Sequence, residues 1–259
     1  MVSVSTPILI IYSGLLGLVV GSFLNVVVHR LPRGTSIVFP RSACTFCGGV
    51  LSARDNIPVL SFLLLRGKCR RCSSPISIRY PLVELATSAL FALCAWRFEY
   101  GLETIAATVF CCLLLCLALI DLDHFLLPDR LTLPGILAGL LLQPWLPRTS
   151  FADAALGVLL GAGALILIVN FWYWLRSEEG MGLGDVNMLA MVGAFLGWQG
   201  AAVTLAMATV TGALAGLLLI AFRRLGARSR LPFGVFLSLG AAIALFVGDE
   251  IADFYLGYL

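Results

Sequence analysis

Charged side chains are scarce in this sequence. Only 12% of its 259 residues are Asp, Glu, Lys or Arg, whereas 60% are hydrophobic, and there are just two histidines. A water-soluble domain of ordinary composition has about 25% charged and about 45–50% apolar residues. This chain has too little polar surface to cover a soluble globule, which excludes an ordinary soluble enzyme or binding module. Lipid must therefore be part of its solvent.

No cleavable signal peptide is evident at the start of the sequence. No basic residue precedes the first apolar stretch, and that stretch runs on without a small-residue cleavage site. We therefore expect the stretch to be retained as a first helix. No internal repeat or low-complexity tract stands out, so the chain is expected to form one compact bundle with a small polar module.

Long apolar runs are abundant, and they predict an all-α polytopic membrane protein with about eight transmembrane helices, since each run is near the ~20 residues needed to cross hydrocarbon. The chain is expected to divide into a first transmembrane helix at 1–28, a cytoplasmic module at 29–80 and a membrane-embedded bundle at 81–259. The predicted helices lie at 8–28, 81–97, 104–120, 131–147, 152–175, 186–199, 200–222 and 232–250.

The basic residues predict how the chain is oriented. With eight helices, fifteen of the seventeen Lys and Arg residues fall on one side of the membrane, and only Arg97 and Arg148 fall on the other. Basic loops stay in the cytoplasm. The side with fifteen is therefore predicted to be cytoplasmic, and both termini are predicted to be non-cytoplasmic.

Four cysteines lie in the one long polar segment, 29–80. They form two C-x2-C pairs separated by 21 residues. This spacing is typical of structural zinc sites, in which four thiolates close a tetrahedron and leave no open position for chemistry. Two disulfides are the alternative, but the predicted cytoplasmic location is reducing. We therefore expect zinc to hold the module together through Cys44, Cys47, Cys69 and Cys72.

Acidic residues near transmembrane segments are functional candidates, because a charge is costly within the membrane. Asp121 ends the third predicted helix, and Asp185 follows the glycine-rich loop 180–184. The predicted topology puts both at the cytoplasmic face. Two neighbouring carboxylates share a proton, so one can activate water while the other polarises a scissile carbonyl. The pair predicts an aspartic protease, although the spacing leaves open whether the side chains meet.

Structural explanations stand beside the functional ones. Asp129 is expected to cap the fourth helix, and Asp123 to be solvated, because positions two apart do not share a helix face. The glycines before Asp185 can serve packing alone. Glu84, early in an apolar run, is expected at the interface, paired with a nearby arginine such as Arg79.

Several segments resemble the bacterial type IV prepilin peptidases. Residues 21–32 (GSFLNVVVHRLP) resemble the signature that opens these enzymes. The DNIPVL segment at 55–60, the four cysteines and the RYPLVE segment at 79–84 resemble their cytoplasmic domain. Residues 120–129 (IDLDHFLLPD) and 182–185 (GLGD) resemble their two catalytic motifs, the second being the GxGD motif shared with presenilin-like proteases. The resemblance covers nearly the whole chain, with its motifs in order.

The resemblance implies a reaction and a site. Enzymes of that family cut the short basic leader from prepilins or type II secretion pseudopilins after a glycine, on the cytoplasmic side. They then N-methylate the new amino terminus with S-adenosylmethionine. By resemblance, Asp121 and Asp185 are the catalytic residues and the four cysteines are zinc ligands.

The same resemblance implies a location and partners. It implies a multi-pass protein of the bacterial cytoplasmic (inner) membrane. Its expected partners are prepilin or pseudopilin precursors and membrane lipid, with no nucleic acid. It does not imply which residues bind the methyl donor, and the oligomeric state stays unknown. The methyltransferase activity rests on the resemblance alone, because the chain lacks the glycine-rich strand–turn–helix signature of the usual methyl-transfer fold.

One position departs from the family pattern. The GxGD motif is commonly followed two residues later by lysine, and here that position is Asn187. The lost positive charge is expected to alter efficiency or substrate preference rather than the class of reaction.

Two other functions stay open. One is a presenilin-like or preflagellin-type protease with another substrate, although the cysteine-bearing segment argues against the preflagellin form. The other is a non-catalytic zinc-bearing membrane scaffold or a transporter. A transporter favours ionisable residues near the membrane midplane, whereas Asp121 and Asp185 are predicted at helix ends.

Overall fold

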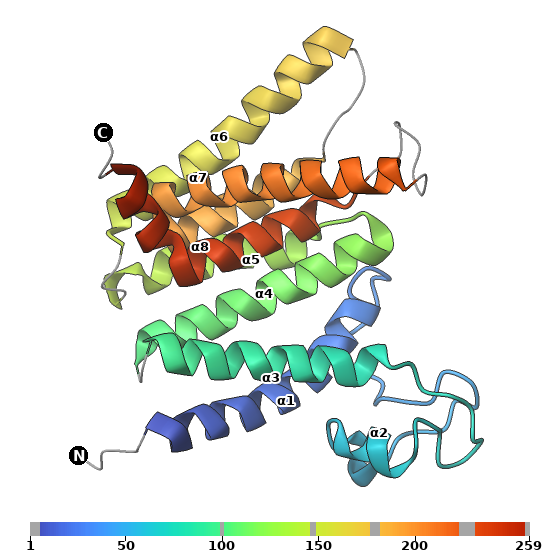
Figure 1. The fold of residues 1–259 in the computed structure, drawn as a ribbon. Coiled ribbons are helices and arrows are strands. Elements are labelled where there is room, and N and C mark those ends of the chain that lie inside the picture. The colour runs from blue at the N-terminus through green and yellow to red at the C-terminus, as the bar shows by residue number, and fades with distance from the viewer. Residues whose placement is uncertain (1–5, 99–100, 146–148, 177–181, 223–230, 257–259) are drawn as a thin grey trace. The chain divides into compact units, whose positions relative to one another are not determined.

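The structure is a computed structural model that describes residues 6–98, 101–145, 149–176, 182–222 and 231–256. These residues form helices joined by loops, with only two isolated β-bridges. The chain divides into two compact units, Met1–Thr108 and Val109–Leu259. Figure 1 shows the elements in chain order: α1 (Thr6–Arg30), η1 (Ala53–Asn56), α2 (Leu60–Leu64), α3 (Arg79–Phe98), α4 (Leu102–His124), α5 (Asp129–Leu142), η2 (Gln143–Trp145), α6 (Phe151–Arg176), α7 (Leu183–Ala221) and α8 (Phe233–Leu256).

Within the described ranges, five helices are long and apolar enough to cross a membrane, namely α1, α3, α4, α6 and α7. The chain is therefore a multi-pass all-α membrane protein. Two further apolar helices are shorter: α5, with 14 residues, and the stretch Phe233–Gly248 of α8. The predicted count of about eight spans follows from these seven helices if α7 crosses twice.

The length and course of α7 fit a helix that crosses the membrane twice. A straight helix of its 39 residues would be roughly 59 Å long at 1.5 Å per residue, about twice the ~30 Å of a hydrocarbon core. The helix is broken at Gly197, whose φ of 70° and ψ of −176° are not helical. Glycine accepts this conformation at low cost because it has no Cβ.

Contacts at its two ends show that α7 turns back on itself at Gly197. The start of α7 and the start of α8 both contact Leu127, through Gly184 and Gly234. The far end of α7 approaches the same region, since a Cβ on Gly216 would lie 3.2 Å from Leu231, just before α8. The predicted runs 186–199 and 200–222 therefore correspond to the two arms of α7, with the break at Gly197 (Figure 1).

In the first unit, α1 and α3 pack closely as an antiparallel pair. A Cβ on Gly17 would lie 2.7 Å from the Ser88 backbone, and one on Gly21 would lie 2.7 Å from the Glu84 backbone. The Ser88 hydroxyl donates a hydrogen bond of 2.8 Å to the carbonyl of Gly14. The glycines of α1 thus form the surface on which α3 lies, as small residues do in membrane helix pairs.

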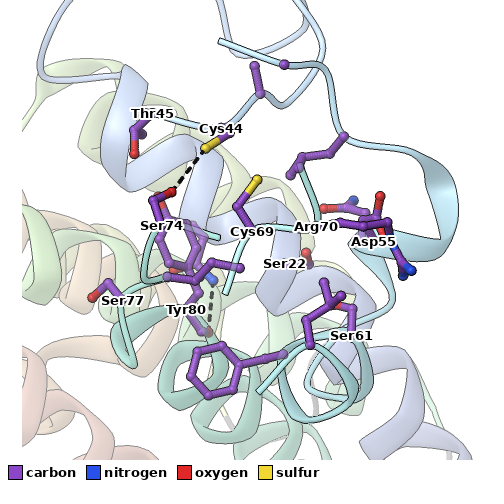
Figure 2. A pocket seen from close by; sticks show the side chains of 18 of the residues that line it. Ser22, Cys44, Thr45, Asp55, Ser61, Cys69, Arg70, Ser74, Ser77 and Tyr80 are labelled. Carbon is purple, nitrogen blue, oxygen red and sulfur yellow. Dashed lines mark hydrogen bonds and ion pairs between the residues drawn. The ribbon is translucent and has the colours of Figure 1, made fainter. Parts of the chain in front are cut away.

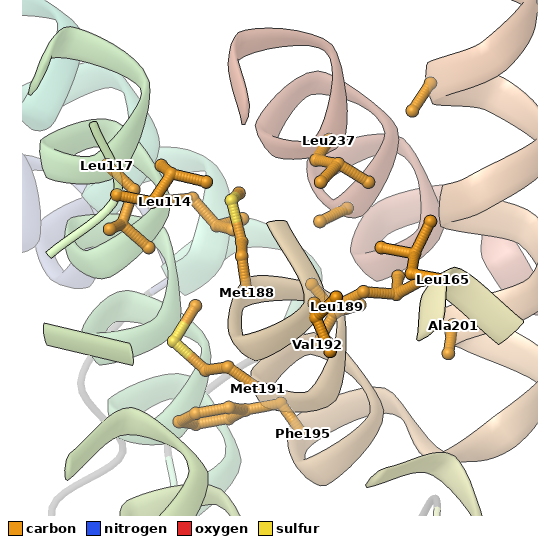
Figure 3. Close-up of a cluster of buried hydrophobic side chains, with 14 of the residues drawn as sticks. Leu114, Leu117, Leu165, Met188, Leu189, Met191, Val192, Phe195, Ala201 and Leu237 are labelled. Carbon is orange, nitrogen blue, oxygen red and sulfur yellow. The ribbon is translucent and has the colours of Figure 1, made fainter. Parts of the chain in front are cut away.

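In the second unit, the first arm of α7 lies in the core. Its side chains Met188, Leu189, Met191 and Val192 are at most 1% exposed. They pack with Leu114, Leu117, Leu165 and Leu237 from three surrounding helices (Figure 3). This apolar arm positions the residue at its own start, Asp185.

A close contact between α6 and α7 gives a testable prediction. A Cβ on Gly193 would lie 2.2 Å from the carbonyl of Gly157, so Gly193→Ala must push α6 and α7 apart. We expect a loss of about 1–3 kcal/mol, as for other overpacked cores, measured by thermal unfolding in detergent. Gly163→Ala is the control, because its Cβ would meet no atom within 4 Å. Equal melting temperatures for the two variants would contradict this packing.

Candidate active site and metal centre

The two predicted catalytic aspartates lie at the same end of the second unit. Asp121 is in the last turn of α4, and Asp185 is in the first turn of α7. The Asp121 side chain is buried, at 6% exposure, and Asp185 is half-buried. Gly184, the neighbour of Asp185, and Gly234, beside the Asp121 carboxyl, both approach Leu127, so the fold brings together two acids that are far apart in the sequence.

Two glycines allow this approach. A Cβ on Gly184 would lie 2.8 Å from the Leu127 Cβ. A Cβ on Gly234 would lie 2.9 Å from Oδ2 of Asp121 and 2.8 Å from the Leu127 side chain. Both helix starts therefore reach the turn after α4 only because these positions lack side chains. Gly184, predicted either to serve chemistry or to serve packing, has a clear packing role.

The surroundings of Asp121 leave one oxygen available. The backbone N–H groups of Gly234 and Val235, in the first turn of α8, interact with its carboxyl group. A helix N-terminus favours negative charge. Among the described residues, however, Oδ2 of Asp121 is buried without a hydrogen-bond partner. Because an unmet buried acceptor is costly, this oxygen is suited to receive water or a substrate group.

The start of α8 is the part of this site that sequence reasoning missed. Gly234 and Val235 contribute backbone N–H groups, which have no side-chain signature. The only available signal was a glycine at the beginning of the last apolar run. The first two residues of the loop 180–184 lie outside the described residues.

The neighbouring polar residues differ in part from expectation. Asp129 does not cap α5: the N-cap is Pro128, which has no side chain able to cap. The Asp129 carboxylate instead accepts a hydrogen bond of 2.9 Å from Nδ2 of Asn187. Asn187 therefore ties the start of α7 to the start of α5. Asp123 is exposed, as expected.

The four predicted metal ligands form one cluster in the first unit. The Sγ atoms of Cys44, Cys47, Cys69 and Cys72 all lie within 4.8 Å of one another. The Sγ atoms of Cys44 and Cys72 are 3.8 Å apart. A tetrahedron with Zn–S bonds of about 2.3 Å has edges of about 3.8 Å. The cluster can hold one metal ion, and its donor set and size fit zinc.

Two matching turns build this cluster. In each, the backbone N–H of the first cysteine bonds to a carbonyl five residues on: Cys44 to Gly49 at 2.9 Å and Cys69 to Ser74 at 2.8 Å. Each turn closes with an antiparallel bridge, Ala43 to Val50 and Lys68 to Pro75. The local sequence therefore presents each cysteine pair on a tight knuckle.

Hydrogen bonds within the knuckles also shift the pKa values of the thiols. Backbone N–H groups of Cys47 and Phe46 lower the pKa of Cys44 to about 6. The Ser74 hydroxyl and then its N–H lower the pKa of Cys72. For Cys47, the Gly49 N–H acts in the lowering direction, but the neighbouring thiols outweigh it and raise the pKa to about 11. Cys44 is thus ready as a thiolate at neutral pH, whereas a bound cation is needed to ionise Cys47.

Comparison with known proteins shows which family the chain resembles. Residues 15–98 match the family profile described as the bacterial peptidase A24 N-terminal domain, and residues 108–217 match the type IV leader peptidase family. No solved structure matches the chain.

Curated relatives match over most of their length. A prepilin leader peptidase/N-methyltransferase of Aeromonas hydrophila is 41% identical, over 93% of this chain and 92% of the relative. The relative of that name in Pseudomonas aeruginosa is 38% identical, over 94% and 92%. The one in Myxococcus xanthus is 45% identical, over 86% and 67%. This chain therefore belongs to the type IV leader peptidase family and is an aspartic peptidase of the membrane.

Proposed function

We propose that this protein cuts the basic leader from type IV prepilins or type II secretion pseudopilins after a glycine, at the cytoplasmic face of the bacterial inner membrane. The observation that carries the proposal is the approach of Asp121 and Asp185 at one end of the second unit. The relatives' name, prepilin leader peptidase/N-methyltransferase, supports the choice of substrate.

The mechanism follows from two acids in one site. Neighbouring carboxylates share a proton because both cannot easily ionise. One of Asp121 and Asp185 takes a proton from the attacking water, and the other gives its proton to the carbonyl oxygen of the scissile bond. The water oxygen bonds to the carbonyl carbon in this step. When the C–N bond then breaks, the first acid passes the proton taken from water to the leaving amine, and the second acid recovers its proton from the hydroxyl of the intermediate. The amides at the start of α8 stabilise the negative charge of the Asp121 carboxylate, and its buried Oδ2 accepts a hydrogen bond from the attacking water.

The predicted topology suits this substrate. A pilin precursor is a membrane helix with a basic leader on the cytoplasmic side, so its scissile bond lies near the membrane surface. Asp121 and Asp185 lie at helix ends, and both termini of the chain are proposed to be non-cytoplasmic. We propose that the chain consists of a first transmembrane helix at 1–28, a cytoplasmic module at 29–80 and a membrane-embedded bundle at 81–259.

The second proposed step is methylation of the new amino terminus. The α-amine forms an N–C bond to the methyl carbon of S-adenosylmethionine as the S–C bond breaks, which leaves a neutral thioether and releases one proton. Zinc held by the four cysteines is proposed to keep the module at 29–80 folded. Zinc takes no part in either reaction, because four thiolate ligands leave no open coordination position on the metal.

The product of the reaction tests the proposal. Purified protein and a prepilin are combined in vesicles with S-adenosylmethionine, and the product is sequenced by mass spectrometry. We expect a chain that begins directly after the leader glycine and carries one methyl group on its amine. Without the methyl donor, the same cut should occur without the methyl group. An uncut prepilin would contradict the peptidase step, and a cut but unmethylated product would contradict the second step.

A further inference from the structure

A cavity of about 330 Å³ lies in the first unit, beside the metal centre, since Cys44 and Cys69 are among its lining residues (Figure 2). Its walls come from the second half of α1, the cysteine-bearing module and the start of α3, all between Ser22 and Glu84. Small-molecule sites in proteins are typically clefts of about 300–1,000 Å³. The cavity is therefore large enough for one small organic ligand.

The lining combines apolar surface with fixed polar groups. Phe46, Phe62 and Tyr80 bring aromatic rings to the walls. On one side of the cavity, Nε of Arg70 contacts Oδ1 of Asp55 at 2.7 Å (Figure 2). A guanidinium has five N–H donors, so this contact leaves others for an anion. Asp55 is held ionised, because the Ser52 hydroxyl and then Arg70 lower its pKa.

A buried acid completes the polar lining. Glu84, expected at the interface, is only 7% exposed, and its Oε2 accepts a hydrogen bond of 2.7 Å from the Val59 N–H. Val59 has a φ of +59°, which is unusual for a β-branched residue. Its neighbours Pro58 and Leu60 close a three-residue turn through a hydrogen bond of 2.5 Å. This turn aims the Val59 N–H at the carboxylate and fixes Glu84 in the wall.

We propose that this cavity binds S-adenosylmethionine, with Glu84 and the Asp55–Arg70 pair as its recognition groups. The inference rests on the proposed methyltransferase function, since the donor must bind somewhere on the chain. Its site is assigned here from the cavity, its lining and the fixed acid.

The chemistry of the donor matches the walls. An adenine ring stacks on aromatic side chains such as those of Phe46, Phe62 and Tyr80. The amino-acid end carries a carboxylate and an ammonium, which pair with Arg70 and Asp55 respectively. The sulfonium is a cation, and a buried carboxylate such as Glu84 favours it.

The charge of the lining argues against a nucleoside triphosphate. Asp55 and Glu84 balance Arg70 and Arg71 in the walls. A triphosphate carries several negative charges and needs a strongly positive site or a helix N-terminus. A donor with mixed charges suits a lining with mixed charges.

A matched pair of variants on α2 tests the assignment. Ser61 lines the cavity and is labelled in Figure 2, so Ser61→Trp should fill it. Leu63 lies two residues on, is 64% exposed and is not in the lining, so Leu63→Trp is the control. Binding of S-adenosylmethionine to the purified, zinc-loaded full chain is measured by calorimetry. We expect affinity to fall at least about tenfold in Ser61→Trp, since the ligand loses its space, and to stay unchanged in Leu63→Trp.

Glu84→Gln tests the charge while keeping the shape. Its amide oxygen can still accept the Val59 N–H, but the negative charge is gone, so affinity should fall by about tenfold or more. Zinc content and leader cleavage should stay at wild-type levels in all three variants, which shows that they are folded. ATP should not compete with the donor, whereas S-adenosylhomocysteine should.

The possible failures are distinguishable. If the wild type methylates a pilin but Ser61→Trp binds the donor as tightly as the wild type, the cavity is not the donor site and the proposed function stands. If the wild type neither binds S-adenosylmethionine nor methylates, the methyltransferase proposal fails, and this inference fails with it. Displacement by ATP would overturn the assignment of ligand class.

Discussion

Cys69→Ser is expected to remove zinc from the protein and unfold the cysteine-bearing module. The module at 29–80 has few buried side chains of its own, and α2 has none. A segment of about 50 residues cannot build a stable core alone. Structural zinc contributes about 10–16 kcal/mol of apparent binding free energy in zinc-finger peptides. Its loss should therefore unfold the module. Metal analysis and limited proteolysis measure both effects.

Cys94→Ser is the matched control for this prediction. Cys94 is fully buried in α3 and lies outside the four-thiol cluster. It should keep the full zinc content and resist proteolysis within 29–80. Because the proposed donor cavity includes Cys44 and Cys69 in its walls, Cys69→Ser should also lose methylation. A stable, zinc-free protein that methylates fully would contradict the structural role of the metal.

The helices were largely predictable because apolar runs report burial in lipid directly. The predicted runs 8–28, 81–97 and 152–175 agree closely with α1, α3 and α6. The run 131–147 was too long at its end, since α5 ends at Leu142 and a short 3-10 turn follows. Pro144 accounts for this, because it has no backbone N–H to continue the α-helical hydrogen bonds.

The cysteine cluster was predictable for a local reason. Each C-x2-C pair forms on its own knuckle, so the spacing alone carries the geometry. The approach of Asp121 and Asp185, in contrast, depends on how distant helices pack, because Gly184 and Gly234 make room for it at Leu127. Sequence spacing could suggest this approach only through a predicted topology.

Other features left no sequence signal. The cavity is lined by three separate segments between Ser22 and Glu84, and no sequence motif predicts a cavity. Asn187 was noted as an exception to a family pattern, but its bond to Asp129 became evident only when α5 and α7 were placed together. The role of the backbone amides at the start of α8 was equally unpredictable, because every residue except proline has a backbone N–H.

Asp121→Asn and Asp185→Asn are each expected to lower the rate of leader cleavage about a thousandfold or more, since general acid–base catalysis typically contributes 10²–10⁴-fold. Asparagine keeps the shape of aspartate but cannot exchange the shared proton. The two residues act as a unit, so removing either should cost about as much as removing both. The change at Asp185 should not loosen the fold, because that side chain is only half-buried.

The most direct test of this account compares leader cleavage by four proteins in the same vesicles: the wild type, Asp121→Asn, Asp185→Asn and Asp123→Asn. Asp123 is the matched control, an exposed acid two residues from Asp121 on the same helix. We expect rapid cleavage by the wild type and by Asp123→Asn, and almost none by the other two, with all four equally stable to heat. Cleavage at the wild-type rate by either Asp121→Asn or Asp185→Asn would contradict it.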